Sequence, residues 1–168
     1  MTRHAPSIGA ALIAGVAADV VNTAMLWGFQ ALGVSTAHGG LLRLLRGWGN
    51  GVASALAASP LPVPTQGFQV GFHAAVGLIM AIGYAVVLES RLPGPAWAKA
   101  LVMALALWLV NAALVLPATG EGFAGSRHLP AAGLAAFALA HTAFFLVLAM
   151  VYAELCRRAT VSRMSAQR

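Results

Sequence analysis

Four long apolar stretches divide the chain, and each is long enough to cross a lipid bilayer as an α-helix. They cover about residues 7–33, 66–92, 95–116 and 129–156. About 20 apolar residues, at 1.5 Å per residue, span the hydrocarbon core, whereas barrel strands are shorter and alternate in polarity. A helix also pairs its own backbone amides and carbonyls, as hydrocarbon requires. The pattern predicts an all-α integral membrane protein, folded as an antiparallel four-helix bundle.

The loop between the first two stretches carries a different pattern, over about residues 38–58. Apolar side chains recur there at helical spacing, at Leu41, Leu45, Trp48, Val52 and Leu56, and the arginines point elsewhere. Helices with tryptophan and arginine beside an apolar face lie in the membrane interface. We therefore expect an amphipathic or re-entrant helix in this first outer loop, acting as a lid over the bundle or as a substrate gate.

Composition and charge support a membrane location and give it an orientation. Of 168 residues, 60% are hydrophobic and 8% are charged, whereas about a quarter are charged in a soluble domain. The net charge of +6 resides near span ends, so we assign it to topology and anionic headgroups and expect no nucleic acid partner. Only Arg43, Arg46 and Arg127 fall in the two outer loops, while the other seven of the ten Lys and Arg residues share the side of the termini. This bias predicts a bacterial inner-membrane protein with both termini cytoplasmic.

The chain is expected to form a single membrane domain over residues 1–168. The first apolar run continues to Gly33, which favours an uncleaved first span over a removed signal peptide. A basic tail at residues 157–168 is expected to be disordered at its end.

A few polar side chains interrupt the apolar spans and are the candidate site residues. They are Asp19 and Asn22 in the first span, His73 in the second, Asn111 in the third and His141 in the fourth, with Trp108 on the stripe of Asn111. A polar side chain that faces lipid is left unsatisfied, and a charge there is costlier still. These residues are therefore expected to face inward and to form one polar cluster open toward the outer side.

Several chemistries fit that cluster. His73 and His141 are candidate axial ligands of a b-type haem, each with its second ring nitrogen held by Asn111 or Asp19. The same residues suit a proton relay or a quinone head beside Trp108. A third alternative is a polar network that fixes helix register and binds nothing.

Other site types are not expected. Neither histidine has a second ligand at i+3 or i+4, so no metal site is predicted, and no catalytic triad is evident. The glycines of Thr119–Gly125 are not followed by the Lys-Ser/Thr of a phosphate loop, which argues against nucleotide binding. We interpret that segment as an exit turn in which Glu121 is exposed or pairs with Arg127.

The segment from Gly67 to Gly125 contains a characteristic set of residues: Gly71-Phe-His73, Gly77, Tyr84, Glu89, Leu92-Pro-Gly, Lys99, Trp108 and Pro117-x-x-Gly-x-Gly-Phe123. In these residues it resembles a family of small four-span bacterial inner-membrane proteins of unknown function. The resemblance implies a four-span bundle and no assigned activity, and it does not include Val34–Thr65 or His141.

The favoured function is non-enzymatic. Small residues at GxxxG spacing, Gly67 and Gly71, let helix backbones approach closely, which suits an accessory or assembly subunit of a larger membrane complex. The expected partners are the lipid bilayer, bound lipid and other membrane subunits. The alternatives are a haem-, quinone- or proton-handling redox subunit that uses His73 and His141, and a small transporter that depends on Asp19.

Overall fold

The computed structural model describes residues 7–36 and 39–166, and the described residues contain helices and no strand. The helices are α1 (Ile8–Ala31), α2 (Gly40–Ala55), α3 (Gln66–Gly83), α4 (Ala96–Val110), α5 (Leu116–Ala118) and α6 (Ala131–Ala166). π-Helical turns at Tyr84–Glu89 and Asn111–Val115 extend α3 and α4, and a 3-10 turn lies at Phe123–Gly125. Parts of the predicted interfacial segment and of both tails, at residues 1–6, 37–38 and 167–168, lie outside the described residues.

Four of these helical stretches are long and apolar enough to cross a membrane. They cover Ile8–Ala31, Gln66–Glu89, Ala96–Ala118 and Ala131–Ser165. The all-α prediction and the four long apolar helices are therefore confirmed, and the chain has the make-up of a multi-pass membrane protein.

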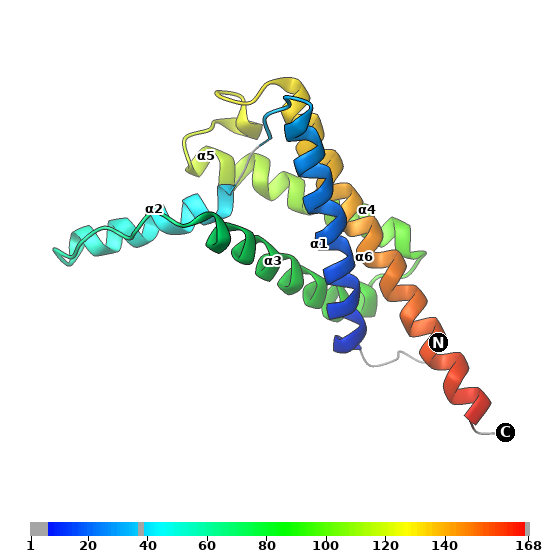
Figure 1. Cartoon of the computed structure of the whole chain (residues 1–168). Helices are drawn as coiled ribbons and strands as arrows, with labels where there is room; N and C mark the ends of the chain where they lie inside the picture. Colours follow the sequence, from blue (N-terminus) through cyan, green and yellow to red (C-terminus); the bar gives the residue numbers. More distant parts are fainter. Residues whose placement is uncertain (1–6, 37–38, 167–168) are drawn as a thin grey trace.

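Helix α6 is the centre of the arrangement, with α1 and α4 packed along it (Figure 1). The Ser7 amide at the start of α1 donates to the Tyr152 hydroxyl of α6 over 3.2 Å. Past the other end of α1, the Ser35 carbonyl lies so close to Gly133 that a side chain at Gly133 would collide with it. The two helices are therefore antiparallel over their whole length of contact.

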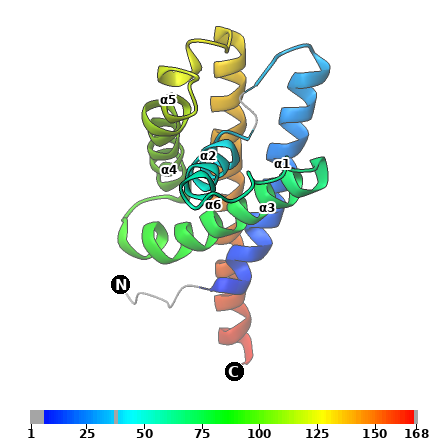
Figure 2. The same cartoon turned by 90° about the vertical axis from the view of Figure 1, so that its left-hand side faces the viewer.

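Helix α3 crosses α1 obliquely instead of standing upright beside it (Figure 2). Small residues allow this close crossing, because a methyl group at Gly15 would come within 2.8 Å of Ala81 Cβ. On the α4 side, contacts concentrate at the turn end, between Tyr84–Glu89 and α4. The hairpin of the second and third spans is therefore splayed, unlike the regular antiparallel bundle that we expected, and a space remains between its arms.

Polar side chains gather where α1 begins, beside the part of α6 that carries Tyr152. The Tyr84 hydroxyl donates to Glu89 Oε2 over 3.1 Å, and Lys99 Nζ lies 3.0 Å from Glu89 Oε1. Tyr152, which accepts from the Ser7 amide, stands edge-on to Tyr84 with ring centroids 6.1 Å apart. We call these five residues the paired end of the core.

Helix α2 projects sideways from the other helices (Figure 1). The predicted apolar stripe is largely uncovered, with Trp48 63% exposed and Leu56 74% exposed. Three glycines lie in the middle of this helix, and it is nevertheless continuous from Gly40 to Ala55.

The basic tail is helical as far as Ala166, because α6 continues to that residue, and the end of the tail at residues 167–168 lies outside the described residues. Glu154 pairs with Arg157 and Arg158, one turn further on. Such i,i+3 and i,i+4 pairs stabilise a helix that has left the apolar region. The hydropathy pattern therefore predicts where the apolar span ends, but it does not predict where the helix ends.

Candidate functional site

A cavity of about 370 Å³ fills the space between α1, α3, α4 and α6, within the size range of small-molecule sites. Five of the six predicted site residues line it: Asp19, Asn22, His73, Asn111 and His141. Aromatic rings from α3 and α6 complete its wall, namely Phe72, Phe137 and Phe144. Trp108, the sixth predicted residue, is half-buried on α4 and does not line the cavity.

The polar wall is built where α1 and α3 cross. Asp19 and Asn22 lie one turn apart on α1, so both side chains face α3. Asp19 packs against Gly77, where any side chain would overlap its carboxylate. One turn along the crossing, Asn22 Oδ1 lies 3.0 Å from His73 Nε2. At the crossing, Asp19 of α1 thus lies against Gly77 of α3, and Asn22 of α1 contacts His73 of α3.

The contact with Asn22 indicates which His73 ring nitrogen carries a proton. An amide oxygen only accepts, so His73 Nε2 carries the proton in this contact. Sequence reasoning had assigned the holding role to Asn111 or Asp19, and the structure gives it to Asn22.

His141 is held by its own helix. Its Nδ1 lies 2.9 Å from the Phe137 carbonyl oxygen, which only accepts, so Nδ1 is the donor, and in the neutral ring Nε2 then has the lone pair. The ring also packs on Phe137, with centroids 4.1 Å apart. His141 therefore presents a neutral, oriented acceptor to the cavity.

Asn111 contributes in a different way. Its Nδ2 donates to the Leu107 carbonyl over 3.0 Å, within the same helix, so this amide group is used locally instead of holding a histidine. Asn111 begins the π-helical turn, and Pro117 follows shortly after. Proline lacks the amide hydrogen that would bond the carbonyl four residues earlier, which accounts for the loosened helical pattern.

Two buried polar atoms on the α1 wall have no hydrogen-bond partner among the described residues: Asp19 Oδ1 and Asn22 Nδ2. Asp19 is 9% exposed and Asn22 is 1% exposed, so bulk solvent does not satisfy them. A buried unsatisfied group costs about 1–3 kcal/mol, and more if it is charged. An acceptor and a donor one turn apart therefore lack a hydrogen-bond partner within the described chain.

A cluster of charged side chains connects α2 with the turn before α6. Arg43 Nη1 lies 2.7 Å from Glu121 Oε1, and His128 Nδ1 lies 2.8 Å from Glu121 Oε2. Burial raises the pKa of Glu121, but the hydrogen bonds from Arg43 and His128 outweigh burial and hold this pKa below its usual value. We call Arg43, Glu121 and His128 the α2 latch, because they connect α2 with the turn before α6. The first turn of α2, including Leu41 and Leu42, lines the cavity.

The α2 latch was missed by sequence reasoning, which left Glu121 either exposed or paired with Arg127. Arg127 instead donates its backbone amide to the Glu121 carbonyl over 3.0 Å. The available signal was weak: Glu121 is the only acid in either outer loop, so its cation had to come from one of three arginines.

Among the described residues, no three His, Cys, Asp or Glu side chains lie close enough together to hold a metal ion. Histidines from two helices, each with one nitrogen already held, remain compatible with a cofactor between them. Comparison with known proteins gives no match among protein-family models, curated proteins or solved structures. The function therefore has to be argued from this cavity.

Proposed function

We propose that the protein binds the head of a small lipid-soluble ring compound of the quinol type within the membrane. The observation that supports this proposal best is the orphaned pair of Asp19 Oδ1 and Asn22 Nδ2. A phenolic hydroxyl is both a donor and an acceptor, so it can donate to the carboxylate and accept from the amide. The aromatic wall of Phe72, Phe137 and Phe144 suits a flat ring.

The proposal also includes a membrane topology. Helices α1, α3, α4 and α6 cross the bacterial inner membrane with both termini cytoplasmic, as the Lys and Arg bias favours. Helix α2 lies in the outer interface, where its exposed Trp48 and Leu56 contact lipid. The cavity is then reached from the outer leaflet, beside the start of α2.

Quinol binding can be tested by titrating the purified protein anaerobically with a short-chain benzoquinol while following tryptophan fluorescence, because Trp27 lines the cavity. A hydrogen bond to a charged group is worth about 1.5–3 kcal/mol, so Asp19→Ala should raise Kd about 10- to 100-fold. Tyr84→Phe removes a polar group from the paired end and is the matched control. Equal affinity of the wild type and Asp19→Ala would refute the proposal.

A haem would give a different result in the same preparation. A Soret band that is lost in both His73→Ala and His141→Ala would assign the cavity to haem b instead of a quinol.

A second function is favoured by a separate observation on α3. A methyl group built at Gly67 or at Gly71 meets no atom within 4 Å, so this GxxxG face does not serve packing inside the described chain. It is available to a helix of another subunit, as an accessory or assembly protein requires. Substitution Gly71→Leu should then release a stoichiometric partner during purification and leave the benzoquinol affinity unchanged, whereas retention of the partner would argue against this role.

A further inference from the structure

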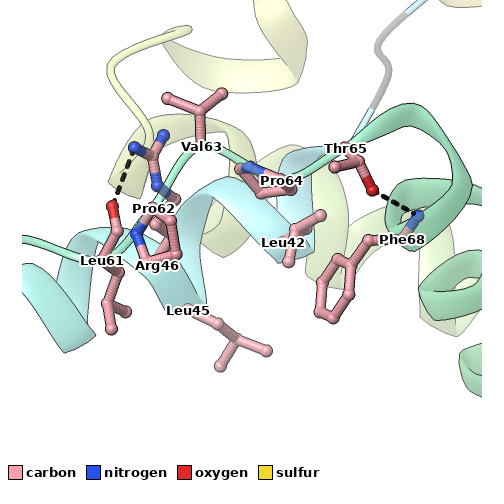
Figure 3. A pocket seen from close by; sticks show the side chains of 9 residues that line it. All are labelled: Leu42, Leu45, Arg46, Leu61, Pro62, Val63, Pro64, Thr65 and Phe68. Atoms are coloured by element: carbon pink, nitrogen blue, oxygen red, sulfur yellow. Dashed lines mark hydrogen bonds between the residues drawn. The ribbon is translucent and has the colours of Figure 1, made fainter.

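A second hollow lies outside the spans, between α2 and the proline-rich segment that leads to α3. It has a volume of about 490 Å³. Its lining residues are Leu42, Leu45, Arg46, Leu61, Pro62, Val63, Pro64, Thr65 and Phe68 (Figure 3). Arg46 is the only charged residue among these nine, and none of them is acidic. The groove is therefore apolar with a single cation.

Two hydrogen bonds hold the proline segment on α2 and give the groove a defined wall. The Leu61 amide donates to Asn50 Oδ1 over 2.8 Å, and Arg46 Nη2 donates to the Leu61 carbonyl over 3.2 Å. The Leu61 side chain then packs over Gly49, where a methyl group would come within 2.5 Å of Leu61 Cδ1. Gly49 is thus the α2 glycine that the groove requires.

The guanidinium of Arg46 is incompletely used by the protein. One of its nitrogens bonds Leu61, while its Nε is buried without a hydrogen-bond partner among the described residues. Arg43, three residues earlier, is paired with Glu121. Of these two arginines on α2, Arg46 is the one whose charge remains uncompensated by a carboxylate in the described chain.

The groove adjoins the start of a stretch that is long and apolar enough to cross a membrane. Thr65 caps the first turn of α3 by accepting from the Phe68 amide over 3.2 Å (Figure 3), and the membrane-crossing stretch begins at Gln66. The groove wall includes apolar side chains that the protein leaves open, with Leu45 42% exposed and Phe68 57% exposed. An acyl chain placed here runs from the interface into the hydrocarbon region.

We propose that this groove binds one anionic phospholipid, with its phosphate at Arg46 and one acyl chain along Leu45 and Phe68. Charge complementarity selects an anionic over a zwitterionic lipid, because the groove supplies a cation and no carboxylate. The apolar wall selects a lipid over a free phosphate ion. This site rests on the proposed placement of α2 in the interface, and it does not depend on quinol binding in the cavity.

The test is native mass spectrometry of the full chain in detergent, with added phosphatidylglycerol or phosphatidylcholine. One phosphatidylglycerol should remain bound at concentrations where phosphatidylcholine does not. Substitution Arg46→Gln keeps a donor for the Leu61 carbonyl and removes the charge, and it should weaken phosphatidylglycerol binding about five- to tenfold. Arg127→Gln removes a charge from the other outer loop, outside both the groove and the α2 latch, and should leave binding unchanged.

Other outcomes would overturn the site. Equal retention of both lipids, or an unchanged affinity in Arg46→Gln, would exclude a lipid site at this arginine. Displacement of the lipid by inorganic phosphate alone would reduce the site to a simple anion contact, and a polypeptide found in the groove would make it a protein interface. Asp19→Ala should leave the lipid in place, so a failure of quinol binding and a failure of lipid binding are distinguishable.

Discussion

The paired end of the core and the cavity both contain polar groups among apolar helices, but they treat those groups differently. At the paired end, Glu89 meets Tyr84 and Lys99. In the cavity, Asp19 Oδ1 and Asn22 Nδ2 have no partner among the described residues. A paired polar group can be explained by the fold alone, whereas an orphaned one costs stability that the fold does not recover. Under the proposed function, the paired end serves structure and the cavity serves binding.

Removal of one partner at the paired end should have the largest effect. In Lys99→Met the carboxylate of Glu89 loses its cation. The pair is only partly buried, because the Lys99 side chain is 9% exposed and the Glu89 side chain is 30% exposed. Breaking a fully buried pair costs about 3–5 kcal/mol, and the partial exposure of Glu89 reduces this to about 2–3 kcal/mol. Reversible unfolding in mixed detergent measures the loss.

The double variant Lys99→Met, Glu89→Gln, which keeps an acceptor for the Tyr84 hydroxyl, is the control for that loss. It removes both charges, so most of the stability should return. If the double variant remained as unstable as Lys99→Met, the paired end would owe its stability to packing and not to pairing.

The next effect concerns the crossing of α1 and α3. A methyl group at Gly77 overlaps the Asp19 carboxylate, so Gly77→Ala should destabilise the protein by about 1–3 kcal/mol. Gly71→Ala on the same helix meets open space and should be neutral or stabilising by up to about 1 kcal/mol, since alanine favours helix. Equal unfolding midpoints for the two variants would show that the crossing is looser than described.

The cavity should respond to a polar deletion in the opposite direction from the paired end. Asp19→Ala removes a buried carboxylate that lacks a partner at Oδ1. We therefore expect the free energy of unfolding of the ligand-free protein to rise by about 1 kcal/mol. The same unfolding assay measures it. A loss of stability in Asp19→Ala would mean that Asp19 is a structural group like Glu89, and the contrast between the two ends would disappear.

The sequence was sufficient for the parts of the fold that hydrocarbon dictates. Long apolar runs can only be helices there, and polar residues such as Asp19 and His141 must turn away from lipid. Placement of five candidate residues around one cavity follows from the same constraint.

Pairwise geometry could not be predicted in the same way. Periodicity places Asn22 and Asn111 on faces of their own helices, but it does not say which neighbour each face meets. The oblique crossing of α3 decides that Asn22 reaches His73. The pairing of Glu121 with Arg43, which are 78 residues apart, likewise depends on where α2 projects, and no local pattern specifies that.

The smallest predicted effect concerns the α2 latch and is a dependence on pH. The native state holds the pKa of Glu121 below its usual value, so ionised Glu121 stabilises the attachment of α2 fully above the pKa of the unfolded chain, about 4.3. This contribution is lost as the pH falls through the lower native pKa. Spin labels at Ser54 and Ser126, in a Cys156→Ala background, should therefore move apart between pH 7 and strongly acidic pH. In Glu121→Gln the distance should be independent of pH. A pH-dependent distance in that variant would show that another titratable group causes the movement.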